Sequence, residues 1–498
     1  MSEPESMSAD LSLSSAAAGW RLEHSYAQLP ELFHAAIAPT AVRAPRLVVL
    51  NRRLAESLGL AAEALDGDAG AAIFSGNHLP PGAVPLTQAY AGHQYGNFTT
   101  LGDGRAILLG EQITPGGERF DIQLKGSGPT PFSRRGDGRA ALGPMLREYI
   151  ISEAMHALGI PTTRSLAVVA TGEEVWRQEA LAGAVLTRVA ASHIRVGTFE
   201  WAAAAGDEVA VRALVDYTLR RHFPELASEE NPPLALLGTV IERQAALMAQ
   251  WMLAGFVHGV MNTDNMALSG ETIDYGPCAF MDAYDPATVF SSIDRHGRYS
   301  YGNQPGIAQW NLTRLAETLL SVLHSEEKQA VVIAEEALLG FKGRFQHHWL
   351  AGMRKKLGLF GEEAQDAALV ETLLEWMQSA KADFTNTFAS LSHAAPADDS
   401  SRMDANFLRW HERWLARLGR QSQSSAESAQ LRHAHNPAFI PRNHLVEAAL
   451  AAAQQGDLGV MQRLLDVLAA PYDHAKHAPE FRSPAPAGDA AYRTFCGT

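Results

Sequence analysis

The order of the secondary structure that the sequence predicts constrains the fold more than any other feature, because strands come first and long helices follow. Residues 105–114 and 119–125 flank the turn PGGE, and Phe120, Ile122 and Leu124 alternate with polar residues, as in a β-hairpin with one polar face. Apolar residues recur at helical spacing in residues 142–158 and in several segments after residue 240. This separation predicts an α+β protein rather than an alternating βαβ protein.

The charge balance and the cysteine count exclude several classes of protein. The 498 residues include 41 basic and 55 acidic side chains, a net charge of −14 that disfavours nucleic acid as a partner. Two cysteines, Cys278 and Cys496, are too few for a disulfide scaffold or a structural zinc site. No apolar run reaches the roughly 18 residues of a membrane span. We therefore expect a soluble, cytoplasmic protein with no membrane partner; the sequence predicts no oligomeric state.

A glycine-rich turn and a lysine 20 residues later suggest a site for phosphates. In Gly102-Asp103-Gly104-Arg105, glycines would let backbone N–H groups approach phosphate oxygens, although for an isolated motif of this kind a tight turn without a ligand is the better explanation. Lys125 lies on the polar face of the predicted hairpin, where its ammonium could reach nucleotide phosphates.

The predicted helix at 142–158 offers two partners for this lysine. Glu148 could fix Lys125 through an ion pair, as in protein kinases, and Glu153 is the competing partner. Arginines also gather around this region, and their planar guanidinium groups suit phosphate oxygens. These arginines are Arg134, Arg135, Arg139, Arg188 and Arg195.

The segment HGVMNTDN (258–265), followed by Asp274-Tyr275-Gly276, has the spacing of a kinase catalytic and metal-binding loop. Asn265 and Asp274 supply the hard oxygen ligands that Mg²⁺ prefers, and MALSGETIDYG fits a hairpin that would bring them together. The position of the usual catalytic aspartate holds Val260, which cannot accept a proton. Asp264 is the nearest carboxylate within the segment.

Several long segments closely resemble the selenoprotein O family of kinase-like proteins, in the same order along most of the chain. Because these segments are long and unusual, chance matching is a poor explanation. They are YAGHQYGNF (90–98), LGDGRA, QLKGSGPTPFSRRGDGRA, HGVMNTDNM, IDYGPCAFMD, NPAFIPRNHLVEAA (436–449) and the final FCGT.

The resemblance implies a two-lobed, protein-kinase-like fold and transfer of AMP from ATP to protein hydroxyls of Ser, Thr or Tyr. In that family the nucleotide is bound in a reversed orientation, so the acceptor attacks the α-phosphorus. A base placed for attack on the γ-phosphate is then unnecessary, which explains why Val260 stands at the position of the usual aspartate. Asp264 would accept the proton, Asn265 and Asp274 would bind Mg²⁺ or Mn²⁺, and Glu148 would pair with Lys125. The residues implied to contact ATP are Gly102, Gly104, Arg105, Lys125, Asp137, Gly138, Arg188, Arg195 and Asp274.

Two other functions stay open on the residues alone: a phosphotransferase, and a catalytically silent ATP-binding scaffold. A disulfide between Cys278 and Cys496 likewise stays open beside two free thiols. Ser- and Ala-rich residues 392–403 and 420–430 are interpreted as linkers or surface loops. The predicted parts are an N-terminal extension (1–85), a kinase-like lobe with the nucleotide-binding hairpin (86–200), a mainly helical lobe with the metal-binding loop (201–400), and a C-terminal helical extension and tail (401–498).

Overall fold

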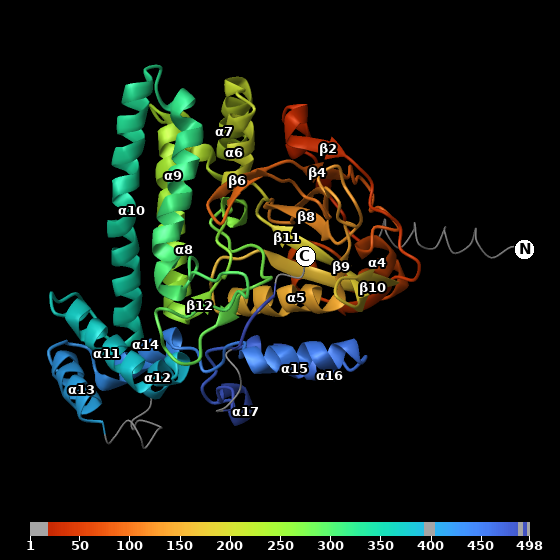
Figure 1. Ribbon diagram of the computed structural model, residues 1–498. Helices are drawn as coiled ribbons and strands as arrows, with labels where there is room; N and C mark the ends of the chain where they lie inside the picture. Colours follow the sequence, from red (N-terminus) through yellow and green to blue (C-terminus); the bar gives the residue numbers. More distant parts are fainter. Residues whose placement is uncertain (1–17, 393–403, 487–491, 496–498) are drawn as a thin grey trace, which may run out of the picture.

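The computed structural model describes residues 18–392, 404–486 and 492–495, and its first half is built on one nine-stranded sheet (Figure 1). Neighbouring strands pair antiparallel in the order β2-β4-β7-β8-β11-β10-β3, with β1 on β7 and β9 on β11. Their bounds are β1 Leu22–Glu23, β2 His34–Ala36, β3 Arg46–Leu50, β4 Leu86–Gln88, β7 Ala106–Ile113, β8 Arg119–Lys125, β9 Ala140–Ala141, β10 Arg164–Trp176 and β11 Ala180–Ala190. Strands β1, β2 and β3, which come before residue 85, join this sheet.

The predicted hairpin is confirmed as β7 and β8, which pair from Ala106 with Lys125 to Ile113 with Arg119. Its polar face, however, is not exposed to solvent. Asp121, Gln123 and Lys125 are all buried, because this face is covered by other charged and polar side chains. Alternation alone could not distinguish a solvent-facing row of polar residues from one that lines an enclosed site.

Helix α5 (Leu142–Ala157) packs against β10 and β11 and ends where the sequence predicts. Gly159 follows it with φ +77°, a left-handed conformation that glycine adopts without strain. Helices α15 (Asn443–Gln454) and α16 (Gly459–Leu468) contact α5 from below the sheet in Figure 1. The C-terminal segment NPAFIPRNHLVEAA therefore supports the helix that carries Glu148.

The second half is mainly helical and stands beside the sheet (Figure 1). In its centre α8 contacts both α9 and α10. The helices are α6 Val196–Ala204, α7 Glu208–His222, α8 Pro232–Ala254, α9 Gln304–Leu323, α10 Glu327–Lys356, α11 Asp366–Ala380, α12 Phe384–Ser390, α13 Ala405–Leu418, α14 Ser425–His435 and α17 Pro479–Arg482. None of the helices among the described residues is long and apolar enough to cross a membrane. The architecture, a sheet-containing half beside a mainly helical half, confirms the predicted α+β class.

Two predictions about loops are wrong. Residues 425–435 form helix α14, because Ser424 and Glu427 build a capping box at its N-terminus, so 420–430 is not simply a linker. Residues 266–274 do not pair with each other as a hairpin; Ala267 instead bridges to Arg195, and Thr272 bridges to Thr162. Residues 393–403, within the other predicted linker, lie outside the described residues.

Lys356, at the end of α10, is a buried cation whose removal should stabilise the protein. Its Nζ lies 4.5 Å from the ring centroid of Phe388, and burial lowers the pKa of Lys356 to about 7. In the unfolded chain Lys356 keeps its proton until the pH nears its ordinary pKa of about 10.4. The free-energy cost of burying the charge is therefore largest below pH 7, and it decreases as the pH rises from 7 to about 10.4. Lys356→Met is therefore expected to add roughly 2–4 kcal/mol to the unfolding free energy at pH 6. The gain should shrink at pH 9.5, whereas exposed Lys355→Met should change stability little at either pH, as measured by denaturant unfolding.

Candidate active site

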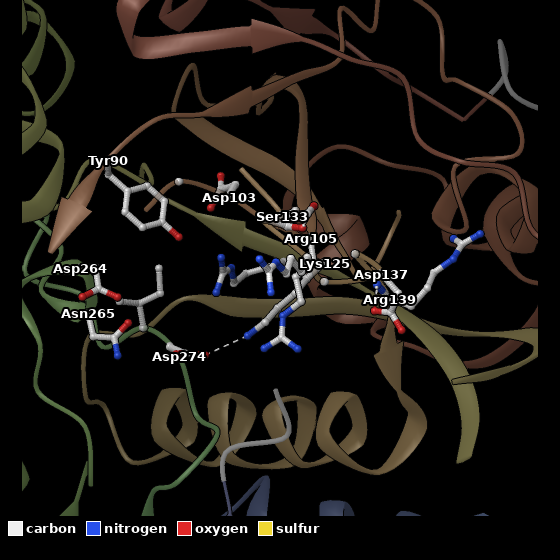
Figure 2. A pocket seen from close by; sticks show the side chains of 18 of the residues that line it. Tyr90, Asp103, Arg105, Lys125, Ser133, Asp137, Arg139, Asp264, Asn265 and Asp274 are labelled. Carbon is white, nitrogen blue, oxygen red and sulfur yellow. Dashed lines mark hydrogen bonds and ion pairs between the residues drawn. The ribbon is translucent and has the colours of Figure 1, made fainter. Parts of the chain in front are cut away.

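A cavity of about 540 Å³ lies between the sheet and the helical half. Figure 2 shows Lys125 between a group formed by Asp264, Asn265 and Asp274 on one side and Asp137 with Arg139 on the other. Seven lining side chains are cationic and four are acidic, the reverse of the balance in the whole chain. The charged lining residues are Asp103, Arg105, Lys125, Arg135, Asp137, Arg139, Arg177, Arg188, Arg195, Asp264 and Asp274.

Lys125 is held by two carboxylates. Its Nζ donates to Oε2 of Glu148 at 2.6 Å and to Oδ1 of Asp274 at 2.9 Å. The competing candidate, Glu153, instead forms an ion pair with Arg164 at 2.6 Å. The sheet, helix α5 and the DYG segment thus meet at one buried ammonium.

Asp274 has an unusual backbone and a strongly acidic side chain. Its φ of 70° lies in the left-handed region, which is rare for a residue with a β-carbon and is often found at functional sites. Burial alone would raise the pKa of Asp274, but the charge and hydrogen bond of Lys125, with the charges of Arg188 and Arg105, hold it well below its usual range. The carboxylate is therefore ionised at neutral pH, as a cation ligand must be.

Arg188 and Arg195 enter the cavity as buried cations from the sheet and from the segment that follows it. Arg188 donates to Oε1 of Gln123 at 2.6 Å and lies 3.5 Å from Glu148, while Arg195 lies 3.4 Å from Asp103. The Nε groups of both arginines are buried and have no hydrogen-bond acceptor among the described residues. Buried N–H donors without acceptors are costly, so these groups favour an anionic ligand.

Asp264 and Asn265 line the cavity next to Asp274. Burial raises the pKa of Asp264 to about 7, and its Oδ1 has no hydrogen-bond partner within the described ranges. Nδ2 of Asn265 donates to the carbonyl of Val260 at 3.0 Å, which leaves the amide oxygen as its available ligand atom. His258 is buried and donates from Nε2 to the carbonyl of Ile273, which ties the HGV segment to the residue before Asp274.

A small hairpin that sequence reasoning left without a role fixes the Asp264 loop. Strands β5 (Ala91–Gln94) and β6 (Asn97–Thr100) pair with each other, and the backbone N–H of His93 donates to Oγ1 of Thr263 at 2.7 Å. At Gly92 an added Cβ would lie 2.3 Å from Oδ1 of Asp264. Gly92, the first glycine in YAGHQYGNF, thus leaves room for the buried carboxylate of Asp264.

The glycines implied to contact ATP line the cavity, but tight packing already requires two of them. A Cβ at Gly102 would lie 2.4 Å from the ring of Phe132, and Gly102 has φ +124°. A Cβ at Gly138 would lie 2.1 Å from the backbone of Gly128. Asp137, beside Gly138, forms an ion pair with Arg177 at 2.9 Å.

Several lining residues escaped sequence reasoning. Tyr90 and Asp103 lie inside YAGHQYGNF and LGDGRA, two of the segments that resemble the family. Their position in these segments was the sequence signal that could have identified them as site residues. Trp176 and Arg177 come from the tip of the β10–β11 hairpin and carried no signal in the sequence.

The acidic residues do not form a metal centre of protein ligands alone. Within the part of the chain that the structure describes, no group of three or more His, Cys, Asp and Glu side chains could hold a metal ion. Asn265 and Asp274 nevertheless fit Mg²⁺, which commonly takes one or two protein ligands and completes its shell with phosphate oxygens and water. Cys278 is a buried free thiol, and burial raises its pKa to about 12; Cys496 lies outside the described residues.

The chain is similar to known proteins along most of its length. Residues 19–469 match the family described as "Protein adenylyltransferase SelO". Proteins called "Protein nucleotidyltransferase YdiU" are similar along nearly their whole length: the one from Alkaliphilus metalliredigens is 60% identical, covering 96% of this chain and 98% of that protein, and the one from Brevibacillus brevis is 61% identical with the same coverage. A solved structure of ROP2 from Toxoplasma gondii, described as a virulence factor with a protein-kinase fold and no enzymatic activity, matches over 68% of this chain and 88% of that chain at 12% identity, with a TM-score of 0.23.

Proposed function

Because the chain belongs to the SelO family of protein adenylyltransferases, we propose that it transfers AMP from ATP to Ser, Thr or Tyr hydroxyls of proteins in a reaction that depends on Mg²⁺ or Mn²⁺. In this reaction the acceptor oxygen attacks the α-phosphorus, and the bond from that phosphorus to the bridging oxygen of the β-phosphate breaks. Pyrophosphate leaves, and the hydroxyl proton passes to the carboxylate of Asp264.

The observation that carries this proposal is the position of the buried cations. Lys125, Arg188 and Arg195 are all at least nine-tenths buried, and two of them present N–H groups that have no acceptor among the described residues. Three phosphates are the part of ATP that such groups bind best. With the terminal phosphates in this buried region, the α-phosphorus would face Asp264, Asn265 and Asp274, which suits transfer of AMP rather than of the γ-phosphate.

Each residue then has a distinct task. Lys125, Arg188 and Arg195 neutralise and orient the phosphates, and Glu148 holds Lys125 in position. Asn265 and Asp274 would hold the divalent cation, which when bound supplies positive charge for the phosphate oxygens. Asp264 accepts the proton, a smaller contribution than the placement of charge around the phosphates.

A kinase reaction is the second candidate, because the contacts of Lys125 with Glu148 and Asp274 match those that position ATP in protein kinases. Val260 speaks against it, since its side chain is apolar at the position of the catalytic aspartate. A silent scaffold would bind ATP without transferring any part of it.

Intact mass spectrometry after incubation of the protein with ATP and Mg²⁺ tests the proposal. Self-modification is expected to add one AMP per modified site. A mass gain of phosphate size would support the kinase instead, and an unchanged mass both for the protein and for added acceptor proteins would support the silent scaffold.

A further inference from the structure

The two ends of the cavity differ in burial. Lys125, Arg188 and Arg195 are 4–6% exposed, whereas Trp176 at the tip of the β10–β11 hairpin is 70% exposed. Asp137 also lines the exposed part, and Figure 2 places it on the opposite side of Lys125 from Asp264. If the terminal phosphates of a nucleoside triphosphate lie among the buried cations and its α-phosphorus faces Asp264, the ribose must turn back past Lys125 for the base to reach this exposed rim.

Aromatic faces for a base are few among the described residues that line the cavity. Among its lining residues the aromatic rings are those of Tyr90 and Trp176. The guanidinium carbon of Arg195 lies 4.3 Å from the ring centroid of Tyr90, so one face of that ring is already covered. The indole of Trp176 is the other aromatic surface and is largely exposed, and an exposed tryptophan is a common stacking platform for bases.

The backbone of Trp176 is held next to the glycine-rich loop. Arg177 donates from Nη1 to the carbonyl of Trp176 at 2.8 Å and to Oδ2 of Asp137 at 2.9 Å. Its Nη2 also donates to the carbonyl of Arg139 at 2.9 Å. These bonds join the hairpin tip to the loop, and Gly136 and Gly138 leave that part of the rim without side chains.

We propose that Trp176 stacks on the nucleobase at the rim and is a determinant of nucleotide affinity, an inference that rests on the reversed placement in the proposed function. Stacking on an indole uses the π-face that every base has, so it contributes affinity without reading the base edge. Trp176 would thus bind the nucleoside end, and the buried cations the phosphate end, as separable parts of one site.

Calorimetric binding of ATP and of inorganic tripolyphosphate, both with Mg²⁺, tests this separation. Trp176→Ala is expected to raise the Kd for ATP roughly 10-fold, the order of one lost base–aromatic stack. Trp176→Phe, which keeps an aromatic face, should recover most of that affinity. Tripolyphosphate carries no base, so its Kd should be the same for the wild type and both variants, which also shows that the phosphate end is intact.

The proposal is overturned if Trp176→Ala leaves the Kd for ATP unchanged, or if it weakens ATP and tripolyphosphate by the same factor. Equal losses in the Ala and Phe variants would also contradict stacking. The proposed function fails by a different result. If the wild-type protein transfers the γ-phosphate rather than AMP, the reversed orientation of the nucleotide is wrong, whatever the Kd values of the Trp176 variants.

Discussion

Lys125→Met is expected to lower the rate of AMP transfer by roughly 10²–10³-fold, the range found when a single preorganised electrostatic group is removed. The substitution keeps an unbranched side chain but removes the ammonium that bonds Glu148 at 2.6 Å and Asp274 at 2.9 Å. Two carboxylates would then face a cavity that must bind an anion. The rate is measured by transfer of label from α-labelled ATP at saturating Mg²⁺, with circular dichroism to check folding.

Arg164→Met is the matched control for this variant. Arg164 pairs with Glu153, a second glutamate of α5, at 2.6 Å, but it does not line the cavity. The control removes a cation from the same junction between sheet and helix, so it should cost stability and leave the rate at saturating ATP within a few-fold. A folded Lys125→Met protein with more than half of the wild-type rate would contradict the role of Lys125.

Asp274→Asn should cause the other large loss, roughly 10³-fold, because it removes a charge that both Lys125 and the divalent cation require. Raising the Mg²⁺ concentration should restore little activity, since a neutral amide also leaves the positive charge of Lys125 without its second partner. The measurement is the transfer rate as a function of Mg²⁺ concentration.

Asp264→Asn is the comparison within the same cavity. It changes the buried carboxylate of Asp264 to an amide of the same shape, and loss of a proton acceptor is expected to cost roughly 10²-fold. Asp274→Asn should therefore be the more damaging of the two. If Asp264→Asn were the worse variant at every Mg²⁺ concentration, proton abstraction rather than charge placement would dominate the reaction.

Local sequence patterns predicted the elements of this fold better than their environments. The hairpin of β7 and β8 and helix α5 follow from alternation and helical spacing, and both are confirmed. The burial of the polar face of β8 could not be predicted, because it depends on Glu148, Arg188 and Arg221, which come from elements far along the chain. Capping of α14 by Ser424 and Glu427 was readable as a capping box, yet the Ser-rich composition suggested a linker.

The candidate site shows the same division. The spacing of HGVMNTDN and DYG predicted that Asn265 and Asp274 lie in one site, and both line the cavity. The hairpin expected between them does not form. The choice between Glu148 and Glu153 needed the register of α5 against β8, which no local pattern contains. Trp176 was missed because an isolated tryptophan at a hairpin tip has no periodicity to reveal it.

The most direct test of the account is which phosphate of ATP reaches the protein. Parallel reactions with α-labelled and γ-labelled ATP, Mg²⁺ and the wild-type protein are separated on denaturing gels, with Asp274→Asn as the inactive control. The account predicts label on protein from α-labelled ATP and none from γ-labelled ATP, whose label should appear in pyrophosphate. Label on protein from γ-labelled ATP alone would contradict it.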